Sequence, residues 1–284
     1  MDDKSKTENY LLAETYKYFL ESPEPSVKHT SYFAVYDYLF SKFKNKEIVF
    51  VEVGVLNGGS LFMWRKYFGK NARIIGIDLN PNAKKWEAHG FEIFIGNQGD
   101  VKFWSETLNQ IGKIDILLDD GGHTYKQQVI TVESAVNSIN ENGLIVIEDV
   151  QTSYLKGFGP RRYSFIKYTK NMIDKINLRS GELASLPKQK TESRKIWSVQ
   201  TFESIVAFHV NPEAVNSVST RIQNHSISTN TLDYRYLDNK IFGSSSIYKD
   251  GYLRKFRIVK YFGIKTLKLI SFLDSLKSRY YRHF

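Results

Sequence analysis

With 284 residues, 42% hydrophobic and 25% charged, the chain has the composition of an ordinary folded protein, which excludes wholesale disorder and suits one large domain with or without appendages. No apolar run reaches about 18 residues, which excludes a membrane-spanning helix, and the absence of cysteine excludes disulfides, thiolate metal sites and a cysteine nucleophile. The net charge of +10 does not indicate a nucleic-acid-binding body, because nine basic residues and one acid in 252–284 give that tail +8 and leave about +2 elsewhere.

The first two predicted elements are helical. Residues 1–26 are typical of a polar helix that ends at the Pro23-Glu24-Pro25 break. Residues 30–44 place large apolar side chains at helical spacing, which predicts an amphipathic helix. We therefore expect an N-terminal helical segment over residues 1–46.

Short apolar runs alternate with helical patterns over the next hundred residues. Strands are predicted at 48–55, 72–79, 91–96, 113–120 and 143–150, and helices at 60–69, 101–111 and 124–139. This alternation is typical of a parallel sheet covered by helices on both faces. The predicted fold class is α/β, with a doubly wound, mostly parallel, Rossmann-like sheet.

The pattern changes after Val150. A helix is predicted at 163–176, a polar loop at 180–195 and a β-hairpin at 196–210, so the main domain is expected to span 47–212. The remaining residues, 213–284, are predicted to hold a loop-rich segment at 224–247 and a basic amphipathic tail from 252.

The candidate ligand-binding residues follow the first three strands, because open α/β sheets bind ligands beyond the carboxyl ends of their strands. The glycines after Glu52 fall at 54, 58 and 59 and lack the G-x-G-x-x-G spacing, so they fit either a nucleoside site without a pyrophosphate or a plain tight turn. Asp78 could accept both ribose hydroxyls or cap the segment after Pro81. The turn around Gln98 could hold an adenine or cap the helix at 101–111.

The fourth and fifth strands end in a dense group of acids. Asp119 and Asp120 precede Gly121-Gly122-His123, and Glu148-Asp149 end the fifth strand. Like charges this close repel unless a cation lies among them, and oxygen ligands suit Mg²⁺, Mn²⁺ or Ca²⁺. His123, three residues after an acid pair, is a candidate general base.

Five segments then show a resemblance: VEVGVLNGGSLFMW, IIGIDLNP, GNQGD, IDILLDDGGHTYKQQ and GLIVIEDVQTSY follow in order the motifs of class I S-adenosylmethionine-dependent methyltransferases. They are most similar to the metal-dependent sugar O-methyltransferases of the mycinamicin and macrocin type, over about residues 48–178. The pairing of D-D-G-x-H with I-E-D-x-x-T-S-Y is the specific part of the resemblance. One departure is Gly122, where the family commonly has Ser.

The resemblance implies a role for each strand-end residue. It assigns S-adenosylmethionine to Glu52, Gly54, Gly58, Asp78, Gln98 and Asp119. It assigns Mg²⁺ or Mn²⁺ to Asp120, Glu148 and Asp149, and the catalytic base to His123.

The function expected from the resemblance is methylation of a sugar hydroxyl on a glycan or glycosylated metabolite, such as a surface polysaccharide. One alternative, an NAD-dependent sugar oxidoreductase, is disfavoured by the missing G-x-G-x-x-G and the extra acids on the fifth strand. A second alternative is a non-catalytic adaptor that binds a membrane or nucleic acid through its basic tail.

Three further expectations concern partners and location. Lys156, Arg161 and Arg162 are either contacts for an anionic sugar, a nucleotide-sugar or a phosphate, or solvated loop charges. The tail at 252–284 either lies on an anionic membrane or packs on a partner subunit of a homo-oligomer. The acidic start MDDKSKTENY does not fit a secretory signal, so a cytoplasmic protein is expected, with peripheral contact at the inner face of the membrane.

Overall fold

The computed structural model describes residues 9–180 and 195–217, with single positions at 219, 222, 224 and 269. The chain divides into two units, residues 1–220 and 221–284, and the description below concerns the first. The basic tail and nearly all of the predicted loops at 180–195 and 224–247 lie outside the described residues. Within the described part, no helix has both the length and the hydropathy that crossing a bilayer requires.

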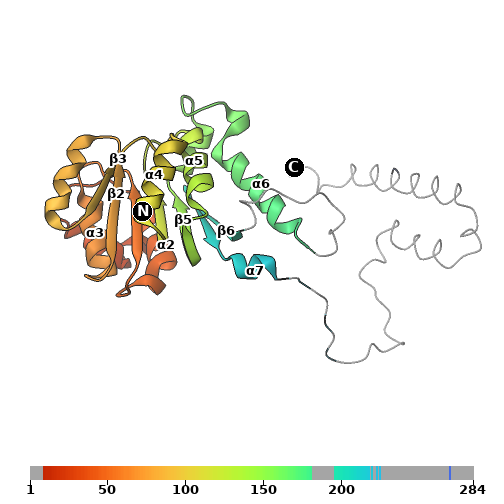
Figure 1. Cartoon of the computed structure of the whole chain (residues 1–284), viewed down its shortest axis with the longest axis horizontal. Coiled ribbons are helices and arrows are strands. Elements are labelled where there is room, and N and C mark those ends of the chain that lie inside the picture. Colours follow the sequence, from red (N-terminus) through yellow and green to blue (C-terminus); the bar gives the residue numbers. More distant parts are fainter. Residues whose placement is uncertain are drawn as a thin grey trace, which may run out of the picture. The chain divides into compact units, whose positions relative to one another are not determined.

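A seven-stranded sheet forms the centre of the first unit (Figure 1). Its strands are β1 (Val49–Val53), β2 (Arg73–Asp78), β3 (Glu92–Ile95), β4 (Ile114–Asp119), β5 (Ile139–Ile147), β6 (Ile196–Phe202) and β7 (Ile205–Val210). They are ordered β3-β2-β1-β4-β5-β7-β6, with β1 to β5 parallel and β7 antiparallel to both of its neighbours. The predicted doubly wound, mostly parallel α/β sheet and the hairpin at 196–210 are confirmed.

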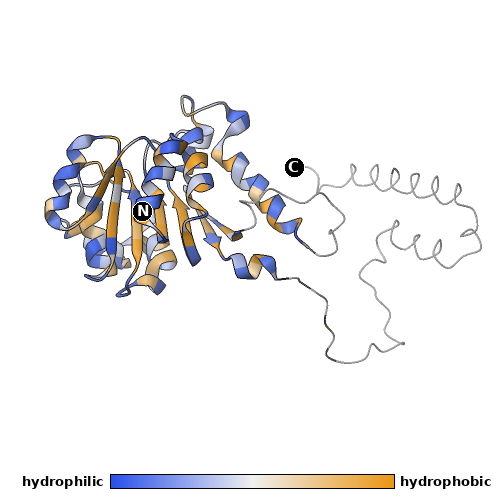
Figure 2. Cartoon of the chain, in the orientation of Figure 1, coloured by the Kyte–Doolittle hydropathy of each residue, from blue (hydrophilic) through white to orange (hydrophobic). Residues whose placement is uncertain are grey.

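Helices cover both faces of the sheet, because successive strand residues point to opposite faces and both sets are apolar. Phe50 packs on one face with α1 (Glu14–Leu20), α2 (Thr30–Phe40) and α3 (Gly59–Phe68). Val51 packs on the other face with α4 (Val101–Ile111), α5 (Tyr125–Ala135) and α6 (Phe165–Asn177). Figure 2 shows the apolar strands between helices of mixed polarity.

The N-terminal helices belong to the same core as the sheet. Helix α1 has no side-chain cap of its own, and Asp37 of α2 accepts the backbone N–H groups of Glu14 and Thr15 at 2.6 and 3.1 Å. This contact satisfies two of the orphan N–H donors at the α1 N-terminus and joins the two helices. The chain between them, residues 21–29, is thereby held beside the sheet.

The remaining elements are short. They are the 3₁₀ helices η1 (Asn9–Leu12), η2 (Ser41–Phe43), η3 (Pro81–His89), η4 (Val150–Tyr154) and η5 (Arg161–Tyr163), and the helix α7 (Pro212–Asn216).

Two elements differ from the predictions. The polar N-terminal helix is in fact η1 followed by α1, which ends at Leu20. Helix α5 ends at Ala135, and β5 already begins at Ile139, where a helix was predicted. Ile139 pairs with Ile114, and the register then shifts before Leu144, with Asn142 at a positive φ of 62°. Because this stretch of β5 is irregular, its residues do not show the alternation of a regular strand, and the start of β5 was not predicted.

Candidate active site

The carboxyl ends of β1, β2 and β4 enclose a cavity of about 360 Å³. It lies where the strand order reverses between β1 and β4, the position at which open α/β sheets bind ligands. Five predicted site residues line this cavity: Gly54, Asp78, Gln98, Asp120 and His123. The other five, Glu52, Gly58, Asp119, Glu148 and Asp149, are not among its lining residues.

The glycine turn after β1 has a geometry that other residues would not fit. Gly54 has a φ of +93°, and a Cβ there would lie 2.1 Å from the carbonyl oxygen of Asp120. Gly58 has a φ of +83°, and its Cβ would lie 2.3 Å from the Trp86 ring. Both positions therefore require glycine for two reasons: a neighbouring group lies too close for a Cβ, and φ is positive. The turn leaves the backbone of Gly54 open to the cavity.

Asp78, at the end of β2, holds the glycine turn in place. Its Oδ2 accepts the backbone N–H groups of Val55 and Leu56 at 2.8 and 2.9 Å. The alternative role as a cap falls to Asn80, whose side chain accepts the N–H of Asn82 at the start of η3. Asp78 also lines the cavity, so its carboxylate faces both the turn and any bound ligand.

Gln98 supports the turn that follows β4. Its Nε2 donates to both carboxylate oxygens of buried Asp119, at 2.9 and 3.1 Å, and its Oε1 accepts the N–H of Gly122 at 2.8 Å. Burial raises the pKa of Asp119. Asp100 of the same turn caps helix α4 by accepting the N–H of Lys102, so the predicted cap is confirmed. Gln98 therefore shapes the cavity wall, and its predicted contact with an adenine stays a prediction.

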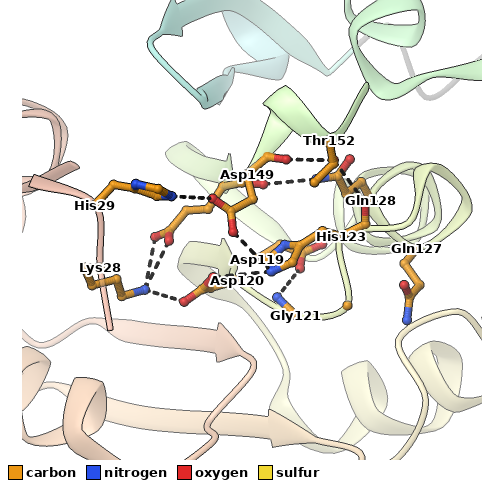
Figure 3. A network of polar contacts seen from close by, with 12 residues as sticks. Lys28, His29, Asp119, Asp120, Gly121, His123, Gln127, Gln128, Asp149 and Thr152 are labelled. Atoms are coloured by element: carbon orange, nitrogen blue, oxygen red, sulfur yellow. Dashed lines mark hydrogen bonds and ion pairs between the residues drawn. The ribbon is translucent and has the colours of Figure 1, made fainter. Parts of the chain in front are cut away.

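Asp120 and His123, which line the cavity, converge with Asp149 (Figure 3). The Nε2 atom of His123 lies 3.8 Å from Asp120 Oδ1 and 3.3 Å from Asp149 Oδ2. One ligand atom from each residue lies within 4.8 Å of the others, so the three are close enough together to hold a metal ion. Two carboxylates and an imidazole therefore fit a divalent cation.

The backbone at two of these residues is strained. His123 and Asp149 have φ values of +56° and +54°, in the left-handed region that only a few non-glycine residues occupy. Such strain costs about 1–3 kcal/mol and concentrates at functional sites. The Nδ1 atom of His123 is buried and has no hydrogen-bond partner within the described part of the chain. Nε2 is therefore the nitrogen that faces the two carboxylates.

In a comparison with known protein families, residues 51–150 match the family described as "Methyltransferase domain". These residues form a methyltransferase domain. The resemblance seen in the sequence is thereby confirmed, and every predicted site residue, from Glu52 to Asp149, falls inside the domain.

Individual relatives are sugar O-methyltransferases. The chain is 33% identical over 137 residues to 8-demethyl-8-alpha-L-rhamnosyl tetracenomycin-C 2'-O-methyltransferase of Streptomyces olivaceus, covering 46% of this chain and 35% of that protein. It is 30% identical over 131 residues to mycinamicin VI 2''-O-methyltransferase of Micromonospora griseorubida, covering 44% and 32%. The solved MycE methyltransferase, in complex with Mg, SAH and mycinamycin VI, superposes with a TM-score of 0.61 at 25% identity, covering 70% of this chain and 53% of MycE. The chain thus spans about a third of the length of these curated relatives.

The segment before the methyltransferase domain also contributes to the site, which the sequence did not reveal. Tyr32 donates to Asp149 Oδ1 at 2.5 Å, and His29 Nε2 lies 3.9 Å from the same oxygen. Tyr36 donates to Glu148 Oε1 at 2.5 Å. The one signal in the sequence was the i, i+4 spacing of two tyrosines on the apolar face of a helix, since a buried phenol needs a hydrogen-bond partner.

Lys28, in the same segment, is buried among three carboxylates. Its side chain is 2% exposed, and its ammonium lies 2.6 Å from Asp120 Oδ2, 3.1 Å from Glu148 Oε2 and 3.9 Å from Glu52 Oε1 (Figure 3). Glu52 in turn accepts from Ser60 Oγ and Trp64 Nε1. Glu148, predicted as a metal ligand, faces Lys28 and Tyr36 and is not part of the Asp120–His123–Asp149 group.

Burial and charge pairing act in opposite directions on these groups. Burial raises the pKa of Glu52 to about 7 and that of Glu148 well above its ordinary value. Burial disfavours the charged form of Lys28, but Asp120, Glu148 and Glu52 outweigh it and raise its pKa. Burial also opposes ionisation of Asp149, but hydrogen bonds led by the one from Tyr32 outweigh it and lower its pKa. Of the three acids, Asp149 beside His123 is therefore the one whose ionised form the site favours.

The raised pKa of Glu52 predicts a pH-dependent contribution to stability. Because the folded state holds the Glu52 proton up to about pH 7 and the unfolded state loses it near 4.5, wild type should lose stability relative to Glu52→Gln as pH rises between these values. Above about pH 7 the difference should be constant. Urea unfolding of both proteins from pH 4 to 9 measures it, and a constant difference over the whole range would contradict the assignment.

Proposed function

We propose that this protein is an S-adenosylmethionine-dependent O-methyltransferase that uses a divalent cation and acts on a sugar hydroxyl of a glycan or glycosylated metabolite. The observation that carries the proposal is the cavity itself, which Gly54, Asp78, Asp120 and His123 all line. The relatives support it, since they are sugar O-methyltransferases and MycE was solved with Mg and SAH.

The cofactor half of the cavity would hold S-adenosylmethionine, which supplies a methyl group on a sulfonium. The open backbone at Gly54 would admit the methionine part, while Asp78 would accept the ribose hydroxyls. Gln98 and its neighbours would line the adenine pocket. Glu52 supports the turn through Ser60 and Trp64, which keeps the cofactor half rigid.

A divalent cation held by Asp120 and Asp149 would lower the pKa of the acceptor hydroxyl. His123 Nε2 would take the hydroxyl proton as the oxygen attacks the methyl group. The two carboxylates beside Nε2, at 3.8 and 3.3 Å, would stabilise the imidazolium that forms. The chain's remaining contribution would be alignment of donor and acceptor for in-line displacement.

The acceptor would enter past the segment after η4, where Lys156, Arg161 and Arg162 are exposed. If these residues bind an anionic sugar, the Arg161→Ala/Arg162→Ala double variant should lose about tenfold or more of its transfer to anionic glycans, and little of its transfer to neutral ones. Transfer of labelled methyl groups from S-adenosylmethionine to matched neutral and anionic glycans measures this. An unchanged preference would assign these charges to solvation alone.

Titration calorimetry with S-adenosylmethionine and, separately, with NAD, each with Mg²⁺ and with chelator, tests the proposed function. Micromolar binding of S-adenosylmethionine and none of NAD is expected. Binding of NAD alone would favour the oxidoreductase, and binding of neither would favour the adaptor.

A cytoplasmic location, a homo-oligomer and contact of residues 252–284 with an anionic membrane stay predictions. The membrane contact can be tested by vesicle flotation of the full chain and of a chain without that tail.

A further inference from the structure

Lys28 is a buried cation directly behind the candidate metal group. Its ammonium contacts Asp120, Glu148 and Glu52, while the His123 imidazole lies on the opposite side of Asp120 (Figure 3). A lysine side chain that is 2% exposed is rare, and it is stable here because carboxylates surround it.

Asp120 is shared between these two sides, one oxygen to each. Its Oδ2 accepts from the Lys28 ammonium at 2.6 Å, whereas its Oδ1 faces His123 Nε2 at 3.8 Å. A carboxylate held in this way presents a single oxygen to a ligand in the cavity. Lys28 therefore determines which oxygen of Asp120 is available there.

Glu148 is removed from the cavity by the same contact. Both of its oxygens accept from Lys28, at 3.4 and 3.1 Å, and Tyr36 also donates to one of them at 2.5 Å. Its side chain is fully buried. Its neighbour Asp149 is instead 22% exposed and turns toward His123 at 3.3 Å. Adjacent residues at the end of β5 are thus divided between Lys28 and the cavity.

From this division we infer that Lys28 is a positioning residue of the cation site, which orients Asp120 Oδ1 toward His123 and Asp149 and keeps Glu148 out of the ligand set. The inference rests on the proposed function, because it concerns the cation of that reaction. With Lys28 in place, a divalent cation has two carboxylates at most and keeps positions free for the acceptor. Without Lys28, the second oxygen of Asp120 and the carboxylate of Glu148 also become available to it.

Mn²⁺ titration followed by electron paramagnetic resonance tests the inference without relying on activity. Lys28→Met removes the charge and keeps an unbranched side chain, so we expect Mn²⁺ to bind at least about tenfold more tightly, because a repelling charge is lost and Glu148 is released. Lys28→Met/Glu148→Gln should return close to wild-type affinity. Glu148→Gln alone should leave the affinity within about threefold of wild type.

Two further measurements complete the design. Lys66→Met is the control, because Lys66 pairs with Glu21 on the surface, and it should leave Mn²⁺ affinity unchanged. Without metal, the melting temperature of Lys28→Met should lie below that of wild type, since three carboxylates lose their cation. Mn²⁺ should then raise the melting temperature of Lys28→Met more than it raises that of wild type. If Lys28→Met fails to fold, the double variant and Glu148→Gln carry the test.

Weaker or equal Mn²⁺ binding by Lys28→Met would overturn the inference, as would a large loss of affinity in Glu148→Gln, which would make Glu148 a ligand. Binding by Lys28→Met but not by wild type would support the inference and count against cation use in the proposed function. Binding by neither would overturn it. Calorimetry with S-adenosylmethionine on the same samples shows separately whether the methyltransferase assignment stands.

Discussion

Replacing His123 by Asn is expected to lower kcat for methyl transfer by about 10²–10⁴-fold, while the Kd for S-adenosylmethionine changes by no more than about threefold. The imidazole lines the cavity and can take a proton, and Nε2 already faces both carboxylates. Asn is chosen because it tolerates the φ of +56° at this position, so the turn should survive. Methyl transfer and calorimetry on one preparation measure both quantities.

Two companion variants sharpen this result. His29→Asn removes the other histidine near Asp149, which is 66% exposed and 3.9 Å away, and should cost far less activity. Asp120→Asn should also nearly abolish transfer and, unlike His123→Asn, should weaken Mn²⁺ binding. Substantial turnover in both His123→Asn and Asp120→Asn would remove these residues from the mechanism. Equal loss of Mn²⁺ affinity in the two would make His123 a ligand instead of the base.

Gly54→Ala is expected to destabilise the fold by about 3 kcal/mol and to abolish measurable binding of S-adenosylmethionine. The added Cβ would lie 2.1 Å from the carbonyl oxygen of Asp120, and a backbone atom cannot move aside as a flexible side chain could. To fit it, the ends of β1 and β4 must separate, which opens the cavity. Urea unfolding and calorimetry measure the two effects.

Gly90→Ala is the matched control for this variant. Gly90 has a φ of +81°, close to the +93° of Gly54, but a Cβ there would meet nothing within 4 Å. It therefore isolates the cost of the left-handed backbone, about 1 kcal/mol. If the two variants lose the same free energy of unfolding, the contact between the added Cβ and Asp120 does not destabilise the fold.

The strands and the order of the site residues could be predicted from the sequence because both are local patterns. VFVEV and its counterparts are short apolar runs bounded by glycine and acidic residues, which identify buried parallel strands. In such a sheet the carboxyl ends share one edge, so the sequence predicts Asp78, Asp120 and Asp149 at the same edge. The irregular start of β5 escaped prediction, because the polar stretch around Asn142 does not have the period of a strand.

The role of each acid, by contrast, was decided only by the tertiary structure. Glu148 and Asp149 are adjacent and chemically alike, yet one faces Lys28 and the other faces His123. Lys28 is 92 residues from Asp120 and 120 from Glu148, and no spacing rule connects them. A buried charge is paired with whatever opposite charge the packing brings within about 4 Å, and here the docking of α1 and α2 on the sheet brings it. Local periodicity encodes the sheet and its strand ends, whereas the partner of each buried carboxylate depends on contacts between distant segments.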